Sequence, residues 1–230
     1  MNQLIYCVDD DAPIRELLES NLQREGFRVR AFAEAEGLLS ALGDQLPDLF
    51  LLDWMLPGMD GLDLCRTLRQ TEKARNIPII MLTAKDQEID MILGLEMGAD
   101  DYISKPFSMR ELTTRIKAIF RRVERLENVS QNAILRLGEI EMDPGARRVT
   151  VDGKPITLTL KEFELLKMLL NSKGMVLTRE LMLDTVWGYD YDGGTRTVDV
   201  HIMQLRKRLG VADRYIETVR GVGYRMSGEA

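Results

Sequence analysis

The chain has 230 residues, enough for one large domain or two modest ones. Hydrophobic residues make up 45% and charged residues 30%, a globular balance that excludes a disordered, collagenous or fibrous chain. The formal net charge is −6, from 31 basic and 37 acidic side chains, and taken alone it argues against a nucleic-acid-binding protein, which is usually basic.

Short apolar runs alternate with segments of helical period in the first half of the chain. The runs are Leu4–Val8, Phe27–Phe32, Leu49–Leu52, Ile77–Leu82 and Asp101–Ser104. Their apolar character indicates strands buried on both faces, as in a parallel sheet. Helix signals lie between them, including a capping box at residues 108–111. Five strands alternating with five helices predict an open, doubly wound α/β domain over residues 1–122.

Polar side chains follow four of these strands, at the edge where a doubly wound sheet places its functional site. They are Asp9 and Asp10 after the first strand, Asp53 after the third, Thr83 after the fourth and Lys105 after the fifth. Crowded carboxylates repel one another, and hard oxygen ligands suit Mg²⁺. With Mg²⁺ and the lysine screening it, Asp53 could attack phosphorus and form an acyl phosphate, with the Thr83 hydroxyl bonded to a phosphoryl oxygen.

Each residue of this set, taken alone, has a purely structural explanation, and only the ordered set indicates a phosphoacceptor site. A single Asp at a strand end is usually a helix cap. A kinase is disfavoured, because the chain has no Walker A motif and no glycine-rich loop that opens a helix. A phosphatase with an aspartyl nucleophile needs a second acid two residues further on, where this chain has Met55. The set therefore predicts a phosphoacceptor and not an enzyme, with at most slow autophosphorylation and self-dephosphorylation.

Residues 1–122 resemble the receiver domain of a response regulator, which has a flavodoxin-like fold. The matching segments are VDDD at 8–11, LDWMLPGMDG at 52–61, LTA at 82–84 and DDYISKPF at 100–107. The resemblance implies that Asp53 accepts a phosphoryl group from a sensor histidine kinase, that Lys105 contacts the phosphate, and that the peptide bond before Pro106 is cis. The further implied roles are Mg²⁺ binding by Asp9, Asp10, Asp53 and the carbonyl of Met55, and a switch pair formed by Thr83 and Tyr102.

The second half of the chain has a different pattern. Short alternating strands fill Leu135–Leu158, with turn signals at residues 143–145 and 152–153. Helical patterns follow at Thr159–Asn171, Thr178–Trp187 and Thr195–Leu209, and Tyr215–Met226 has the pattern of a hairpin. Strands, three helices and a hairpin predict an α+β winged helix-turn-helix domain over residues 134–230. The polar segment Glu124–Ala133 is either a helix extension or a linker, and we predict a linker over residues 123–133.

The third of these helices has an apolar face and a mixed face. The core face carries Val198, Ile202, Leu205 and Leu209, and the outer face carries Arg196, Thr197, Val200, His201, Met203, Gln204, Lys207 and Arg208. Such a mixture suits the major groove, where Arg or Lys contacts guanine or phosphate, Gln contacts adenine and apolar groups contact thymine methyls. A solvated amphipathic helix would also explain this pattern, but Thr218 and Arg220 of the hairpin could reach a neighbouring minor groove.

This half resembles the effector domain of the OmpR/PhoB family. The matching segments are LTLKEFELL at 158–166, VWG at 186–188, RTVDVHI at 196–202 and TVRGVGYR at 218–225. The resemblance implies DNA-backbone contacts from Trp187, Arg196, Thr197, His201 and Arg206, and it places Val200, Gln204, Thr218 and Arg220 nearer the bases. Met203 and Gln204 stand where some members carry arginines, so a different base preference is expected.

In this family a phosphorylated receiver forms a two-fold dimer through ion pairs. Glu96 with Lys117 and Asp101 with Arg115 match the pattern, whereas Glu111 would face Met91 in place of a basic residue. Exposed ion pairs contribute about 0–1 kcal/mol each, so a weaker dimer is expected.

These features together predict a phosphorylation-activated, DNA-binding transcription regulator of a two-component system. Its partners would be a sensor histidine kinase, double-stranded DNA, a second copy of the chain and, as a further candidate, RNA polymerase, with Mg²⁺ as cofactor. The alternative is a regulator whose second domain docks onto a protein. The start of the chain lacks a basic segment and no apolar run approaches the ~18 residues of a membrane span, so we expect a soluble cytoplasmic protein with no membrane association.

The distribution of charge removes the objection raised by the net value. Residues 1–122 hold 15 basic and 21 acidic side chains, whereas residues 123–230 hold 16 of each. From Gly193 onward there are 7 basic and 4 acidic side chains. The acidity belongs to the first domain, and the predicted DNA-facing end is mildly basic.

Overall fold

The computed structural model describes residues 3–83, 97–128, 134–172, 174–188 and 194–228. The chain forms two compact units, Met1–Lys117 and Ala118–Ala230. The division falls inside the helix α5, which covers Met109–Asn128. The prediction of a linker over residues 123–133 is therefore wrong for residues 123–128, where the helix continues because the sequence holds no Gly or Pro to end it. Residues 129–133 lie outside the described residues.

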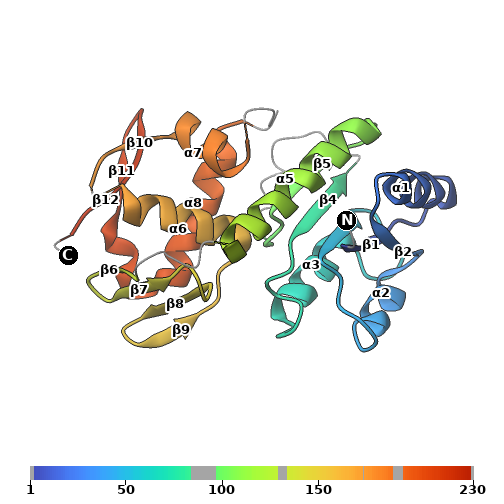
Figure 1. The fold of residues 1–230 in the computed structure, drawn as a ribbon, viewed down its shortest axis with the longest axis horizontal. Coiled ribbons are helices and arrows are strands. Elements are labelled where there is room, and N and C mark those ends of the chain that lie inside the picture. The colour runs from blue at the N-terminus through green and yellow to red at the C-terminus, as the bar shows by residue number, and fades with distance from the viewer. Residues whose placement is uncertain (1–2, 84–96, 129–133, 173, 189–193, 229–230) are drawn as a thin grey trace. The chain divides into compact units, whose positions relative to one another are not determined.

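The first unit is built on a parallel five-stranded sheet (Figure 1). Its strands are β1 (Leu4–Val8), β2 (Arg28–Phe32), β3 (Leu49–Asp53), β4 (Ile79–Thr83) and β5 (Asp101–Ser104), in the spatial order β2-β1-β3-β4-β5. Every residue of β1, β3 and β4 is buried. Burial on both faces explains why these three segments are apolar up to the last residues of β3 and β4, which are Asp53 and Thr83.

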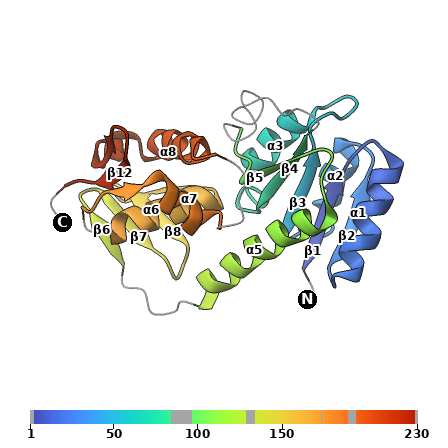
Figure 2. The same ribbon diagram turned by 90° about the horizontal axis from the view of Figure 1, so that it is seen from above.

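Helices cover both faces of this sheet (Figure 2). One face carries α1 (Ala12–Arg24) and α5, and the other carries α2 (Ala35–Ala41) and α3 (Gly61–Gln70). Alternate strand residues such as Tyr6, Phe50 and Met81 pack with Leu64 and Leu68 of α3 in a continuous hydrophobic cluster. The fourth predicted helix would fall in residues 84–96, outside the described residues. The doubly wound α/β prediction is confirmed.

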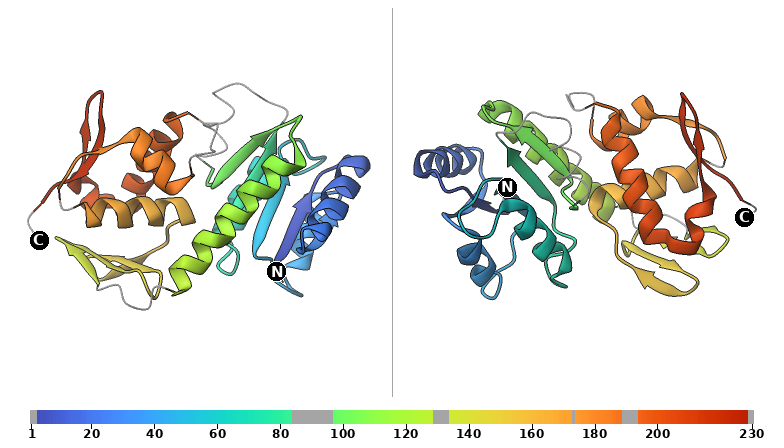
Figure 3. Two further views of the ribbon diagram at one scale, coloured as in Figure 1. Left: turned by 45° about the horizontal axis from the view of Figure 1, so that its top comes forward. Right: turned by 180° about the vertical axis from the view of Figure 1, so that it is seen from behind.

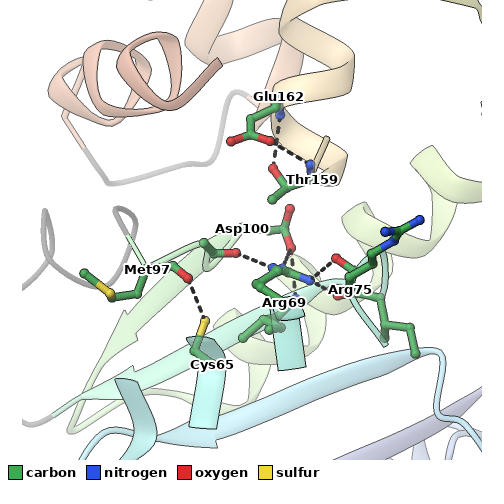
Figure 4. Close-up of polar contacts among 10 residues, drawn as sticks. Cys65, Arg69, Arg75, Met97, Asp100, Thr159 and Glu162 are labelled. Atoms are coloured by element: carbon green, nitrogen blue, oxygen red, sulfur yellow. Dashed lines mark hydrogen bonds and ion pairs between the residues drawn. The ribbon is translucent and has the colours of Figure 1, made fainter. Parts of the chain in front are cut away.

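A buried ion pair joins the end of α3 to the amino ends of β4 and β5 (Figure 4). The Arg69 guanidinium lies 2.7 Å from the Asp100 carboxylate, and the two side chains are only 7% and 0% exposed. Arg69 also donates to the carbonyl of Ile77, and Asp100 accepts from the backbone N–H of Ile79. The network therefore fixes this edge of the sheet, opposite the carboxyl ends.

In the second unit, an antiparallel four-stranded sheet follows the end of α5. Its strands are β6 (Leu135–Leu137), β7 (Ile140–Asp143), β8 (Arg148–Val151) and β9 (Lys154–Ile156), in sequence order. The β8–β9 turn is formed by Asp152 and Gly153, with φ values of 52° and 71°. Positive φ at both positions is the requirement of a tight hairpin turn that favours Asp-Gly, so this turn lies where the sequence predicts it.

The α-helices α6 (Leu160–Asn171), α7 (Arg179–Val186) and α8 (Arg196–Leu209) and a second, smaller sheet follow in this unit (Figure 3). Of these helices, α6 packs against both of the others. Thr159 and Glu162 form the predicted capping box at the start of α6 (Figure 4). After the 3₁₀ helix η1 (Gly210–Tyr215), the strands β11 (Ile216–Val219) and β12 (Gly223–Met226) form a hairpin that pairs with β10 (Leu177–Thr178). The winged-helix prediction is confirmed.

Two features of the described residues bear on function, namely the burial of the cysteines and the length of the helices. Cys7 and Cys65 are fully buried, and burial raises the pKa of the Cys65 thiol to about 11. No helix in the described part of the chain is long and apolar enough to cross a membrane.

Candidate functional site

Three carboxylates meet at the carboxyl edge of the parallel sheet. Asp9 directly follows β1, Asp10 comes next, and Asp53 ends β3. One oxygen from each of the three lies within 4.8 Å of the others. Asp9 and Asp53 are 0% and 4% exposed, whereas Asp10 is open to solvent. The sequence predicts this cluster, because strands β1 and β3 are parallel neighbours whose carboxyl ends must coincide.

A lysine ammonium lies beside two of these carboxylates. Nζ of Lys105 is 2.7 Å from Oδ2 of Asp9 and 3.1 Å from Oδ2 of Asp53. The backbone of Lys105 is fixed by a hydrogen bond of 2.6 Å from its N–H to the carbonyl of Thr83, and the bond to Pro106 is cis. The predicted acidic and basic side chains of the site therefore lie close together at the carboxyl edge of the sheet.

Charge and burial perturb the acid–base behaviour of this site. Burial and the nearby Asp9 raise the pKa of Asp53, and Lys105 opposes this shift only in part. Burial tends to lower the pKa of Lys105, but hydrogen bonds to Asp9 and Asp53 outweigh it and raise that pKa. The cluster thus holds unfavourable negative charge that a further cation would relieve.

Asp53→Asn is expected to increase the free energy of unfolding at pH 7 in the absence of Mg²⁺. Because the pKa of Asp53 is raised in the folded protein, folding binds its proton more tightly and the ionised carboxylate opposes folding. The favourable contribution is complete below the ordinary pKa of 3.8 and is lost as pH rises through the raised pKa. Urea unfolding with a chelator should therefore show a gain for the variant at pH 7 that shrinks towards pH 4.

The matched control for that measurement is Glu72→Gln, which neutralises an exposed acid on the same domain. It should change the free energy of unfolding little, within about 0.5 kcal/mol. An equal gain for Asp53→Asn at both pH values would contradict the electrostatic explanation.

The loop after β3 folds back onto the phosphoacceptor candidate. Asp60 caps α3 by accepting a hydrogen bond of 2.8 Å from the N–H of Asp63. The N–H of Gly61 donates to the carbonyl of Trp54 at 2.9 Å, which brings the start of α3 against the backbone of Asp53. Met55 lies in this loop and is 57% exposed. Its thioether is a soft ligand that does not suit Mg²⁺, so a metal-binding role would fall to its carbonyl, as the resemblance implies.

Sequence reasoning did not assign Arg15, which holds the acidic segment in place. Its Nη1 donates to the carbonyl of Asp9 at 2.7 Å, and the Asp9 carboxylate accepts a hydrogen bond from the N–H of Asp11 at 3.0 Å. The only available signal was the position of Arg15 one turn into the helix that follows the acidic run, which the apolar periodicity of that helix does not distinguish.

The predicted switch residues lie on neighbouring strands. Thr83 ends β4 and is 1% exposed. Tyr102 lies in the middle of β5, opposite Met81, and packs half-buried against the hydrophobic cluster under α3. Thr83 therefore lies at the acidic edge, and Tyr102 lies on the strand next to it.

Comparison with known proteins agrees with this geometry. Residues 5–117 match the response regulator receiver domain, and residues 153–226 match the C-terminal domain of transcriptional regulatory proteins. The chain is 44% identical to the alkaline phosphatase synthesis regulatory protein PhoP of Bacillus subtilis, covering 98% of this chain and 97% of that protein. It is 45% identical to the phosphate regulon regulatory protein PhoB of Pseudomonas aeruginosa, covering 99% and 98% respectively.

Solved structures give the same result. A RitR mutant aligns with a TM-score of 0.80 and 32% identity, covering 99% of this chain and all of that one. DrrB of Thermotoga maritima, an OmpR/PhoB homolog, aligns with a TM-score of 0.51 and 34% identity over the same share of this chain. The chain belongs to the OmpR/PhoB family of response regulators. It is a transcription regulator that joins a receiver to a winged-helix DNA-binding domain.

The charged residues expected at the receiver dimer interface have partners within one chain. Arg115 bonds Asp101 at 3.4 Å and Glu111 at 3.0 Å. Lys117 bonds Glu25 of α1 at 2.6 Å. Glu96, its predicted partner across the dimer, and Met91 lie outside the described residues. Dimerisation through these groups would have to exchange internal ion pairs for intermolecular ones.

The outer face of α8 is narrower than the sequence predicts. Thr197, Val200 and His201 are buried, with 0%, 6% and 3% exposure, so placing them on an exposed face was wrong. The cause is that α8 packs on both α6 and α7, which widens its buried sector beyond a single stripe. The predicted residues that stay accessible on this helix are Arg196, Met203, Gln204, Arg206, Lys207 and Arg208.

Trp187 is also covered, at 5% exposure, and it links the three helices. The Lys161 ammonium lies 4.9 Å from the centre of its indole ring and donates to the carbonyl of Val186. The imidazole of His201 and the Trp187 ring pack in a T-shaped arrangement with centres 4.9 Å apart, and Nδ1 of His201 lies 2.9 Å from the carbonyl of Thr197. Trp187 and His201 thus act here as packing groups.

The hairpin β11–β12 presents the two predicted wing residues to solvent. Thr218 and Arg220 are exposed, Thr218 in β11 and Arg220 at the turn. Arg206 of α8 donates to the Thr218 hydroxyl at 2.8 Å, so two predicted DNA contacts are bonded to each other in the free protein. Sequence reasoning missed Asp199 and Tyr224, which lie inside the quoted motifs and were given no role.

Proposed function

We propose that Asp53 accepts a phosphoryl group from a sensor histidine kinase, and that the modified protein dimerises through its receiver and binds promoters. The observation that carries the proposal is the position of Asp53. Its carboxylate is 4% exposed, lies 3.1 Å from the Lys105 ammonium and belongs to a cluster with Asp9 and Asp10. A carboxylate so placed is a nucleophile with a cation beside it.

The transfer is a displacement at phosphorus. An oxygen of Asp53 attacks the phosphorus of a phosphohistidine, an O–P bond forms and the P–N bond breaks. Its electron pair stays on the imidazole nitrogen, which takes up a proton. Lys105 offsets the charge of the transferred group, and the Thr83 hydroxyl at the end of β4 is the donor to one of its oxygens.

The donor set of the acidic cluster fits Mg²⁺. Three carboxylate oxygens within 4.8 Å of one another are hard ligands, and one of the carboxylates, Asp10, is open to the solvent that Mg²⁺ keeps in its shell. Asp9, Asp10, Asp53 and the carbonyl of Met55 would hold the ion. When bound, it neutralises charge between the carboxylates and the phosphoryl oxygens.

A charge of about −1.5 to −2 at Asp53 would act through the switch pair. Thr83 would move towards the phosphoryl group, and Tyr102 would turn further into the space beside β5. The face formed by β5 and α5 carries Asp101, Glu111 and Arg115, so its repacking would release internal ion pairs for a second copy of the chain. Glu96 and Lys117 are proposed as the other pair of this dimer.

The exposed part of α8 and the wing hairpin are proposed to contact double-stranded DNA. Arg196 and Lys207 would meet phosphates or guanine, and Met203 and Gln204 would meet base edges. Thr218 and Arg220 would approach the minor groove. We further propose a cytoplasmic protein for which RNA polymerase is a partner at promoters, consistent with the family.

The first test is labelling of the full chain by Mg²⁺ and acetyl phosphate. We expect intact mass to increase by one phosphoryl group in the wild type and in Asp63→Ala, whose exposed acid lies on α3. Asp53→Ala should gain none. No mass gain in the wild type, or a gain in Asp53→Ala, would contradict the assignment of Asp53.

The second test is the salt dependence of DNA affinity. About four phosphate contacts per subunit predict a slope near −3.6 for log K against log salt, about a hundredfold loss between 50 and 200 mM. The probe is a duplex enriched from a random library by the wild-type protein. Arg196→Ala with Arg220→Ala should weaken binding and make the slope shallower by about 0.9, the share of the phosphate contact assigned to Arg196.

The control variant is Arg148→Ala, because Arg148 is a surface residue of the four-stranded sheet. It should keep the wild-type slope. An affinity indifferent to salt, or unchanged by the Arg196 and Arg220 substitutions, would favour a second domain that docks onto protein.

A further inference from the structure

One carboxylate joins α8 to the wing hairpin, which we define as β11, β12 and their turn, residues 216–226. Asp199 lies in the first turn of α8. Its Oδ1 accepts a hydrogen bond of 2.6 Å from the hydroxyl of Tyr224 and one of 2.7 Å from Nε of Arg179. Tyr224 belongs to β12 and Arg179 begins α7, so a single oxygen holds three elements together.

Two guanidinium groups lie against the ring of Tyr224. Cζ of Arg179 is 4.9 Å from the ring centre and Cζ of Arg206 is 5.6 Å from it, within the range of a cation–π contact. Arg206 also donates to the carbonyl of Ile216 at 2.7 Å and to the Thr218 hydroxyl at 2.8 Å. Tyr224 pairs with Thr218 across the hairpin, so both strands of the wing are tied to α8.

An acidic side chain on α8, the helix proposed to contact DNA, lowers the affinity for DNA unless it also has a role that favours binding. The segment from Gly193 onward carries 7 basic and 4 acidic side chains, and Asp199 reduces the positive charge that attracts phosphates. The carboxylate of Asp199 bonds to Arg179 of α7 and to Tyr224 of the wing hairpin. Burial and Asp199 together raise the pKa of Tyr224 to about 12, which keeps the phenol protonated as a donor.

We propose that Asp199 is a positioning residue that fixes the wing hairpin against α8 before DNA binds. Held in this way, Thr218 and Arg220 need little further ordering when they reach the groove, and preorganisation of that kind raises affinity for the correct site. This inference deepens the DNA-binding function proposed above and rests on it. Arg179 and Tyr224 serve the same purpose as the partners through which Asp199 acts.

Asp199→Asn tests the proposal because positioning and simple electrostatics predict opposite signs. Asp199→Asn replaces the charged acceptor of both positioning bonds by a neutral amide oxygen, and this weakening should reduce affinity for the enriched duplex about tenfold, or about 1.4 kcal/mol. The preference over a shuffled duplex should fall, and the salt slope should not become shallower, because no phosphate contact is removed. A merely solvated acid would instead give tighter binding to both duplexes once its charge is removed.

Asp213→Asn is the matched control, because it removes the same charge from an exposed acid of η1. It should bind DNA as tightly as the wild type or more tightly. Tyr224→Phe should reproduce the loss of Asp199→Asn, and the double variant should lose little more than either single change, because the two residues share one bond.

Hydrogen exchange of the free protein supplies a readout independent of DNA. Amides of residues 216–226 should exchange faster in Asp199→Asn than in the wild type or Asp213→Asn, with the other amides of the domain unchanged. Unaltered exchange, or DNA binding by Asp199→Asn as tight as the wild type, overturns the inference alone. A wild-type protein that enriches no duplex overturns the DNA-binding function and this inference with it.

Discussion

Arg69→Met is expected to lower the free energy of unfolding of the receiver by about 3–5 kcal/mol, the cost of removing one partner from a buried ion pair. The Asp100 side chain is completely buried, so its charge cannot be transferred to water when the guanidinium is lost. Arg69 also donates to backbone carbonyls of Gly98, Arg75 and Ile77, which would lose a donor together. The substitution thus opens the edge of the sheet where β4 and β5 begin.

The two domains can unfold separately, so the measurement needs a probe in the receiver alone. The chain has two tryptophans, Trp54 in the receiver and Trp187 in the DNA-binding domain. Urea unfolding followed by fluorescence in a Trp187→Phe background reports on Trp54. Arg69→Met combined with Asp100→Asn should lose less than the sum of the two single changes, because the pair is coupled.

Arg66→Ala is the matched control for this experiment. Arg66 lies on the same helix one turn earlier and pairs with Asp63, but both side chains are more than half exposed. An exposed pair of this kind contributes about 0–1 kcal/mol. Similar losses in the free energy of unfolding for Arg66→Ala and Arg69→Met would contradict the argument that burial makes the Arg69–Asp100 pair the costlier one to break.

The receiver was predictable because its signals are local and redundant. The apolar runs of β1, β3 and β4 specify a parallel sheet that is buried on both faces. The strand order then brings Asp9 and Asp53 together, whatever the conformation of the loops. The supporting contacts were not predictable in the same way. Arg15 and Arg69 act through backbone carbonyls, and the identity of such partners depends on tertiary placement that periodicity does not contain.

The DNA-binding domain shows where a helical wheel stops being informative. A wheel assumes one buried face, but α8 packs on two helices and also supports the wing. Val200 is therefore covered although it lies opposite the Leu205 stripe, and His201 is covered at the margin of that stripe. The same tertiary contacts give Asp199 its partners. The sequence identified the motifs that contain these residues, and only the packing separates those that face DNA from those that hold the others in place.

Gly61→Ala is expected to damage the phosphoacceptor site directly. A Cβ at position 61 would overlap the carbonyl oxygen of Asp53 and stand 2.9 Å from the Cα of Trp54. The obstacle is backbone, so it cannot rotate aside as the tip of a flexible side chain would. Either α3 must move away from β3, or the backbone of Asp53 must shift within the cluster that it forms with Asp9 and Asp10.

The expected result is an initial rate of labelling by acetyl phosphate that falls about a hundredfold, the effect of a misplacement of roughly 1 Å. Stability should fall by about 1–3 kcal/mol from overpacking. Gly37→Ala is the matched control, because Gly37 lies within α2 and an added Cβ would meet only the Phe32 ring at 3.5 Å. That variant should keep its labelling rate and gain up to about 0.5–1 kcal/mol from helix propensity. A normal labelling rate in Gly61→Ala would mean that the start of α3 can yield without moving Asp53, and the close approach of the two backbones would then have no part in placing the nucleophile.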